Sequence, residues 1–231
     1  MSMKKVGRRE ALGAIGSAGA ALAFGCGSSP TSPDTTPSNT TTTGSTTAAC
    51  AVTPSETAGP YPSLVDLYRS DIREGKTGTV LTLTVKVVNV NAGCAAVAGA
   101  DVEVWHCDSA GNYSEYGTQT TQNYLRGIQT TNSSGEVTFT TIYPGWYQGR
   151  ATHIHLEVKA NGVSRKITQI AFPESTNTTV YRTGVYASRG SNPNSNLSDG
   201  IFADSLSAEL VTPSGDPTSG YAASCQVAVS V

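Results

Sequence analysis

The sequence predicts an all-β domain, a β-sandwich with long surface loops. The 231 residues are 38% hydrophobic, which is enough to bury a core, but only 14% are charged. So few charges, together with 24 glycines and 11 prolines, argue against a coiled coil or a helical bundle. Several segments also alternate apolar and polar residues with a period of two, which is typical of half-buried strands.

The clearest strand pattern covers residues 80–88. Every second side chain there is a leucine or a valine, so one face of the strand is apolar. Turns rich in glycine, asparagine or proline separate it from further strand patterns, and six or more short strands at this spacing predict a sandwich. The apolar face carries Leu81, Leu83, Val85 and Val87, and the other strand patterns are residues 102–107, 135–142, 153–158, 166–172 and 226–231.

Helical signals are weak throughout the chain. We expect at most a turn or two of helix in residues 64–73 and in residues 205–210, because neither segment has a long apolar period. Residues 188–198 are rich in Asn, Ser and Gly and predict a long surface loop. We expect this loop to be docked on the domain by Phe202.

The first 26 residues have the pattern of an export signal. A basic stretch that includes Arg8 and Arg9 precedes a weakly apolar, Gly- and Ala-rich stretch, residues 11–24. That stretch is too short for a transmembrane helix, and the paired arginines favour the twin-arginine route. We therefore expect an exported protein of the bacterial cell envelope, in the periplasm or at the cell surface.

Residues 23–26 resemble a lipobox, in which Cys26 becomes the lipidated first residue. The alternative is soluble export with cleavage nearby. Residues 27–49 contain 14 Ser or Thr and no apolar side chain larger than Ala, so they predict a disordered linker. Residues 50–231 then form the folded domain, and any membrane contact is expected only through the lipid anchor.

Five cysteines occur in the chain, and four of them follow Cys26. In an oxidising compartment four cysteines allow three pairings. We favour Cys94–Cys107, which closes a hairpin-sized loop, and Cys50–Cys225, which ties the start of the domain to its last strand. A thiolate metal site is the rival interpretation, but no Cys-x-x-Cys spacing supports it.

The charge balance disfavours nucleic acid as a partner. The formal net charge is −2, and beyond Cys26 the chain carries 11 basic against 16 acidic residues. A protein that binds nucleic acid is expected to have the opposite sign. The sequence does not indicate an oligomeric state.

Two of the three histidines form a His-x-His pair at positions 153 and 155. On a strand, side chains two residues apart point the same way, with Cα atoms roughly 6.5–7 Å apart, so both imidazoles can bind one metal ion. Ile154, Leu156 and Val158 then face the core on the opposite side. The alternative is that His153 and His155 are polar residues on a solvated strand face.

The segments around this pair resemble the intradiol ring-cleavage dioxygenases, the family of catechol 1,2-dioxygenase and protocatechuate 3,4-dioxygenase. The similarity runs from about residue 53 to residue 172 and rests on five motifs in order. These are Thr57-Ala58-Gly59-Pro60-Tyr61, residues 99–105 with the Gly-x-Tyr turn that ends at Tyr113, Thr141-Ile142 with Pro144-Gly145-x-Tyr147, Arg150-x-x-His153-Ile154-His155, and Thr168-Gln169 with Phe172.

The resemblance implies a mononuclear non-haem Fe(III) bound by Tyr113, Tyr147, His153 and His155, with a solvent hydroxide as a further ligand. The chemistry of the donors agrees, because phenolate is a hard anionic ligand that favours the ferric state. Two phenolates and one hydroxide also neutralise the three charges of the ion.

The resemblance also implies a reaction and residue roles. A catechol-type aromatic diol is cleaved by O₂ between its hydroxylated carbons to a cis,cis-muconate-type dicarboxylate. Tyr147 is expected to leave the metal and act as a base, and Arg150 to stabilise negative charge on the substrate. Gln169 is expected to line the substrate side, and Tyr61 to shape the pocket.

Each role has an alternative. Arg150 could instead form a surface ion pair with Glu157 or Glu115, Gln169 could satisfy backbone groups, and Tyr61 could be an ordinary packing residue. For the whole chain the alternative is a non-catalytic β-sandwich binding module tethered to the envelope. Only two residues separate Tyr147 from Arg150, a shorter link than in the well-known enzymes, so we expect an open, shallow pocket.

Overall fold

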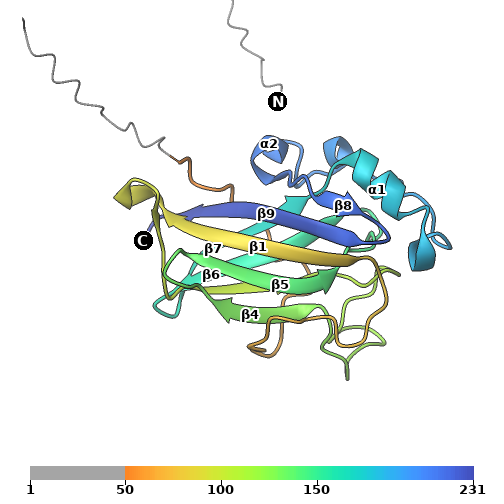
Figure 1. Ribbon diagram of the computed structural model, residues 1–231, viewed down its shortest axis with the longest axis horizontal. Helices are drawn as coiled ribbons and strands as arrows, with labels where there is room; N and C mark the ends of the chain where they lie inside the picture. The colour runs from red at the N-terminus through yellow and green to blue at the C-terminus, as the bar shows by residue number, and fades with distance from the viewer. Residues whose placement is uncertain (1–49) are drawn as a thin grey trace, which may run out of the picture. The chain divides into compact units, whose positions relative to one another are not determined.

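The computed structural model describes residues 50–231. The predicted export signal, the Ser/Thr-rich linker and Cys26 therefore lie outside the described residues. In the described part of the chain, no helix is long and apolar enough to cross a membrane. The strands of residues 50–231 form two sheets that pack face to face as a β-sandwich, which confirms the predicted fold class (Figure 1).

The first sheet is built on the pairing of the first and last long strands of the domain. Strand β9 runs parallel to β1, with Leu81 opposite Tyr221, and β8 follows β9 at the edge. Along its other edge, β1 pairs first with β5 and then, at its last two residues, with β2. The bounds are β1 Val80–Asn89, β2 Ala95–Ala96, β5 Glu136–Ile142, β8 Ser214–Asp216 and β9 Gly220–Val229.

The second sheet is antiparallel throughout, in the order β4-β3-β6-β7. Strands β6 and β7 lie behind β1, β5 and β9 in the view of Figure 1. The bounds are β3 Asp101–Trp105, β4 Arg126–Thr130, β6 His153–Ala160 and β7 Val163–Ala171.

The core lies between the two sheets, where the predicted alternation places it. The four alternating side chains of β1, from Leu81 to Val87, are completely buried, and so are Ile154, Leu156 and Val158 of β6. Each such side chain contributes roughly 1.5–3 kcal/mol when it is removed from water. Since β6 turns these residues inward, its other face presents His153 and His155 on the far side of the sheet, where loops cover them.

Short helices lie among the loops that follow β7. The helical turn expected in residues 205–210 is present as α2, and Phe202 is fully buried, as predicted. Helix α1 was not expected from the sequence. The bounds are α1 Glu174–Val180 and α2 Leu206–Glu209, with 3₁₀ turns η1 Val90–Ala92, η2 Gly184–Tyr186 and η3 Asn196–Ser198.

The helical turn expected in residues 64–73 was wrong. This segment is extended and runs along the edge strands of both sheets. The Arg69 amide donates to Ile128 O in β4 at 3.1 Å, and the Ile72 amide donates to Thr140 O in β5 at 2.9 Å. Its backbone groups are thus paired with strand edges, which is incompatible with intrahelical bonding.

The disulfide prediction was also wrong. Cys50 pairs with Cys94, while Cys107 and Cys225 are free thiols. The reason is topological. Thr53 is hydrogen-bonded to Ala228 near the end of β9, so residue 50 reaches the loop that follows the neighbouring strand β1 and carries Cys94.

Candidate active site

A row of four side chains crosses the second sheet on the face opposite the core. In register, Arg126 of β4 lies beside Trp105 of β3, Trp105 beside His155 of β6, and His155 beside Gln169 of β7. All four are buried. They are covered by loops, including the segment that begins at Glu56, whose amide donates to Ile167 O of β7 at 2.9 Å.

The four predicted metal ligands come together above this row. Tyr113 Oη lies 3.1 Å from His153 Nε2, which lies 3.1 Å from His155 Nε2. The ring of Tyr147 is 5.8 Å from that of Tyr113, measured between centroids. Two ligand atoms at right angles on an ion about 2.1 Å away would be separated by about 3 Å, so the spacing of the three donor atoms fits a shared metal ion.

The protonation of the imidazoles also fits metal binding. His153 Nδ1 lies 2.7 Å from Ala151 O, a contact in which Nδ1 carries the proton, so the lone pair is on Nε2. Burial, followed by the charge of Arg150, lowers the pKa of His153 to about 4. Burial likewise holds the pKa of His155 well below its usual value. Both rings are therefore neutral near pH 7.

On its Nδ1 side, His155 is held by packing rather than by a hydrogen bond. Its ring stacks on Trp105, and its buried Nδ1 has no hydrogen-bond partner within residues 50–231. Gly59 closes the opposite approach, because a Cβ there would lie 3.1 Å from His155 Cε1. With φ at +69°, Gly59 also occupies a conformation that favours glycine.

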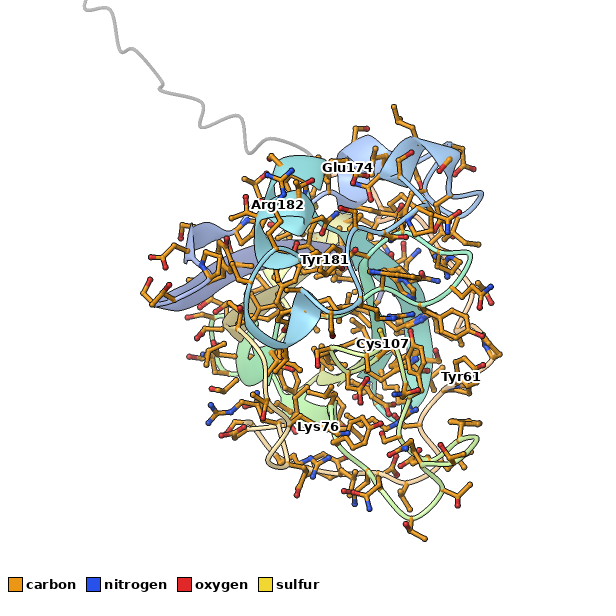
Figure 2. All side chains as sticks on the ribbon, turned by 90° about the vertical axis from the view of Figure 1, so that its right-hand side faces the viewer. Tyr61, Lys76, Cys107, Glu174, Tyr181 and Arg182 are labelled. Carbon is orange, nitrogen blue, oxygen red and sulfur yellow. A yellow bond between two sulfur atoms is a disulfide. The ribbon has the colours of Figure 1, made fainter. Side chains whose placement is uncertain are left out.

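Tyr61 belongs to the site, although the sequence also allowed a packing role. Its hydroxyl is 2.8 Å from that of Tyr147, and its ring stacks on Tyr113 with centroids 4.7 Å apart. The hydrogen bond with Tyr147 raises the pKa of Tyr61 above its usual value. Tyr61 lies toward the margin of the domain in Figure 2, as expected for a residue at the mouth of a cavity.

Arg150 and Gln169 are in direct contact. Arg150 Nη2 donates to Gln169 Oε1 at 2.7 Å, and Gln169 Nε2 donates to Thr57 O at 2.8 Å. The ion-pair partner of Arg150 is Asp199, with Nε and Oδ2 2.8 Å apart. The alternative partners Glu157 and Glu115 were therefore wrong.

The sequence did not point to Arg126 as a site residue. Its guanidinium is buried and donates to Tyr61 O at 2.9 Å and to Ser114 O at 2.7 Å. It thus joins the backbone next to Tyr113 to the segment that carries Tyr61. A single arginine in a short, non-alternating strand gives no sequence signal for this role, and the same holds for Asp199 in its polar loop.

A cavity of about 250 Å³ opens beside the ligand cluster. Tyr61, Tyr113, Tyr116 and Tyr147 line it, together with uncharged loop residues between Gly111 and Gln119. Of the two predicted tyrosine ligands, Tyr113 is buried and Tyr147 is half-buried. An aromatic molecule in this cavity would contact both phenol groups.

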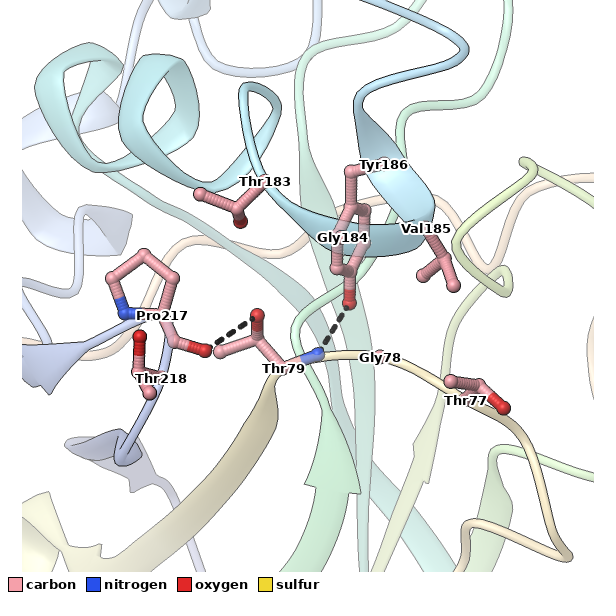
Figure 3. Close-up of a pocket in the computed structure, with 9 residues that line it drawn as sticks. All are labelled: Thr77, Gly78, Thr79, Thr183, Gly184, Val185, Tyr186, Pro217 and Thr218. Carbon is pink, nitrogen blue, oxygen red and sulfur yellow. Dashed lines mark hydrogen bonds between the residues drawn. The ribbon is translucent and has the colours of Figure 1, made fainter.

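Another hollow, of about 330 Å³, lies elsewhere on the domain and holds none of the predicted site residues (Figure 3). Its central groups are already paired, since the Thr79 amide donates to Tyr186 Oη at 3.2 Å and Thr79 Oγ1 donates to Pro217 O at 3.3 Å.

Among residues 50–231, no three His, Cys, Asp or Glu side chains gather to form a metal site. A metal ion bound beside His153 and His155 would therefore need the phenol oxygens of Tyr113 and Tyr147 as ligands.

Comparisons with known proteins point to one enzyme family. Residues 59–189 match the family model described as Dioxygenase. The chain is similar to an intradiol ring-cleavage dioxygenase from Tetranychus urticae, with 32% identity, coverage of 78% of this chain and 95% of that chain, and a TM-score of 0.72. It is also similar to the dioxygenase domain of a dioxygenase carbohydrate-binding protein fusion from Streptomyces sp. SirexAA-E, with 27% identity, coverage of 78% and 99%, and a TM-score of 0.60. Catechol 1,2-dioxygenase from Pseudomonas arvilla C-1 shares the fold at 21% identity, with coverage of 77% and 62% and a TM-score of 0.57.

Proposed function

Because this chain belongs to the intradiol ring-cleavage dioxygenases, a family of oxidoreductases, we propose that it cleaves catechol-type aromatics with O₂ between the two hydroxylated carbons. The products are cis,cis-muconate-type dicarboxylates, and both atoms of O₂ enter the product. The convergence of two phenol and two imidazole groups beside an aromatic-lined cavity supports this reaction.

The proposed cofactor is a mononuclear non-haem Fe(III), bound by Tyr113, Tyr147, His153 and His155. When bound, the ferric ion draws charge from the catecholate and makes its ring reactive toward O₂. Burial raises the pKa of Tyr113 well above its usual value, so its ionisation requires a strong local positive charge. A trivalent cation supplies that charge, and neutral imidazoles complete the ligand set without adding to it.

Tyr147 is the residue proposed to take a proton from the substrate. Tyr147 is half-buried and lines the cavity, whereas Tyr113 is buried against His153. Tyr61 Oη, at 2.8 Å, donates a hydrogen bond to Tyr147 Oη when the latter is ionised and so holds it in place. Tyr147 can then accept a proton at Oη from one hydroxyl of the catechol.

Arg150 is proposed to stabilise the negative charge that develops on the ring. Its Nη1 makes no hydrogen bond to residues 50–231, while Nε and Nη2 are both engaged. One edge of the guanidinium is therefore available to a substrate. Gln169 holds the Arg150 guanidinium through its bond to Nη2, and so lines the same side of the site.

The cavity favours catechols whose remaining substituents are uncharged. None of the side chains that line it carries a formal charge, and Arg150 is not among them, so a carboxylate substituent within the cavity has no charged partner at its walls. Four tyrosine rings provide stacking surfaces instead. The two residues between Tyr147 and Arg150 are exposed, in keeping with the open pocket predicted from this short link.

The convergence of the phenol and imidazole donors carries this proposal, and spectroscopy tests it. Protein produced with ample iron is expected to be burgundy, with a broad visible band that weakens in Tyr147→Phe, and to consume O₂ with catechol. Product analysis must show cleavage between the hydroxylated carbons. Colourless, iron-free protein that consumes no O₂ with any catechol would instead favour a non-catalytic binding module.

We also propose that the enzyme works in the bacterial cell envelope, exported through residues 1–26 and anchored by a lipid on Cys26. The pairing of Cys50 with Cys94 fits an oxidising compartment. Cell fractionation and lipid labelling of the wild type and of Cys26→Ser test this. Label on Cys26→Ser, or wild-type protein confined to the cytoplasm, would contradict it.

A further inference from the structure

We propose that Asp199 is the positioning residue of Arg150, and that the segment from Gly190 to Phe202 holds the loop that carries Tyr147 and Arg150. The inference rests on the proposed function in one respect, namely that Arg150 faces the substrate. Asp199 lies beyond residues 59–189, the part of the chain that matches the family model. The segment from Gly190 to Phe202, beyond the part that matches the family model, would thus complete the site.

The carboxylate of Asp199 is surrounded by donors. Its Oδ2 accepts from Arg150 Nε at 2.8 Å and from the Ala151 amide at 2.6 Å, and its Oδ1 accepts from the Ile201 amide at 2.9 Å. The side chain is 1% exposed, so these contacts are shielded from solvent. Burial alone would raise the pKa of Asp199, but the two amides and Arg150 outweigh it and hold the pKa below its usual range.

The geometry fixes the plane of the Arg150 guanidinium. Asp199 binds it at Nε and Gln169 binds it at Nη2, so two of its three nitrogens are fixed. Because the guanidinium is planar, two such contacts define where Nη1 points. Without Asp199, the single bond to Gln169 would leave the group free to rotate about its stem.

The same segment is attached to the loop at further points. Gly190 O accepts from Trp146 Nε1 at 3.1 Å, and Asn192 Nδ2 donates to Arg150 O at 2.9 Å. Phe202 is fully buried in a cluster with Ala151. The loop is therefore bonded to this segment on both sides of Tyr147 and Arg150.

Asp199 also acts on the backbone that orients a predicted metal ligand. It binds the amide of Ala151, and the carbonyl of Ala151 accepts from His153 Nδ1 at 2.7 Å. The buried carboxylate of Asp199 thus holds both the Arg150 guanidinium and Ala151, the residue that orients the His153 imidazole. A surface ion pair would do neither.

A double-mutant cycle on the full-length, iron-loaded enzyme tests the proposal. Asp199→Asn, Arg150→Gln and the double variant are compared by kcat and KM for catechol, expressed per bound iron. We expect Asp199→Asn to lower kcat about 10- to 100-fold while KM changes less than about 3-fold, because Arg150 acts on charge that develops during the reaction. The double variant should be no slower per bound iron than Arg150→Gln, since Asp199 acts on kcat through Arg150, while its contact with the Ala151 amide should show as a change in iron content.

Asp204→Asn is the matched control. Asp204 lies two residues beyond the segment and is exposed, and its removal should leave kcat and KM unchanged. Wild-type kcat per bound iron in Asp199→Asn, or losses that multiply in the double variant, would overturn the proposal. A merely structural role would reduce iron content and thermal stability but leave the activity of each bound iron intact.

A second arm does not depend on activity. The same four proteins are unfolded in denaturant without iron, where the contact between Asp199 and Arg150 is expected to make the loss in the double variant smaller than the sum of the single losses. Additive losses would overturn the pairing. If the wild type cleaved no catechol, the proposed function would fail, while this arm would still decide whether Asp199 and Arg150 act as a pair.

Asn192→Ala tests the role of the segment itself. This variant removes a bond to Arg150 O and no charge, so it should lower kcat several-fold, and an unchanged kcat would count against the segment's role.

Discussion

The rings of Trp105 and His155 lie parallel, with an interplanar angle of 4° and centroids 4.9 Å apart. A histidine that binds metal usually donates its other ring nitrogen to an acceptor that sets its orientation. His155 Nδ1 has no such acceptor among residues 50–231, so the flat face of Trp105 takes over the orienting role.

The first prediction concerns this stack. Trp105→Leu should weaken iron binding about 10- to 100-fold, the range typical for groups that support a ligand. Trp105→Phe keeps an aromatic face and should lose much less. Competition with a chelator measures the affinity, and circular dichroism checks the fold. Equal losses in both variants would mean that the indole itself, rather than stacking of an aromatic ring, is what matters.

The second prediction concerns the hydroxyl pair at the cavity. Tyr61→Phe removes the hydrogen bond to Tyr147, which is worth about 0.5–1.5 kcal/mol, so kcat should fall about 2- to 10-fold and the visible band should shift. Tyr68→Phe, which removes a hydroxyl on the exposed surface, serves as the control. An unchanged visible spectrum in Tyr61→Phe would show that the pair does not persist in the iron-loaded protein.

The third prediction uses two glycines with similar backbone conformations. Gly59→Ala and Gly99→Ala both place a side chain at positive φ, +69° and +75°, but only the first adds a methyl group close to His155. Both variants should lose stability, since neither backbone conformation suits alanine. Only Gly59→Ala should also lose iron affinity. Equal iron affinities, measured by chelator competition, would argue against His155 as a ligand.

The fourth prediction concerns acid stability. The pKa of Asp199 is lower in the folded protein than in the unfolded chain, so its contribution to stability is complete above the unfolded value near 3.8 and is lost as the pH falls through the folded value. Asp199→Asn should therefore be less stable than the wild type at pH 6, and the difference should shrink below pH 4. Denaturant unfolding of the iron-free protein at several pH values measures it. A difference that stays constant down to pH 2 would contradict the assigned charge.

The fifth prediction concerns the disulfide. Peptide mapping under non-reducing conditions should join Cys50 to Cys94 and leave Cys107 and Cys225 as thiols. For a loop of 44 residues, chain entropy predicts a loss of about 4 kcal/mol on reduction. Buried Cys107, with its pKa raised by burial to about 12, should resist alkylation in the folded protein. A Cys94–Cys107 peptide in the map would restore the pairing first expected from the sequence.

The long strands could be read from the sequence because their alternation directly reflects burial. Residues 80–88 and 153–158 correspond to β1 and β6, and the alternating residues of both are in the core. The histidine pair could be found because it lies on such a strand, whereas Tyr113 and Tyr147 were indicated only by the resemblance to the intradiol dioxygenases. Their convergence is now observed, while their binding of iron stays a prediction.

What the sequence could not indicate depends on contacts between distant segments. Strand β4 is short and contains Gly127, so its pairing with β3 rather than its own pattern defines it. Helix α1 has no apolar period and is held from outside, where Tyr143 Oη donates to Asn177 Oδ1 at 2.7 Å. Asp199 and Asp204 look alike in the sequence, and only the fold buries one of them beside Arg150.

The parallel pairing of β1 with β9 has a consequence for biosynthesis. The ribosome makes β9 long after β1, and Asp199 likewise emerges after Arg150. A nascent chain therefore has neither its central strand pair nor a fully supported arginine until Asp199 and β9 have been synthesised. Contacts between strands so far apart in the sequence slow folding, and β1 stays unpaired on its β9 side until they form. Deletion of β9 should thus prevent the whole domain from folding rather than shorten one sheet.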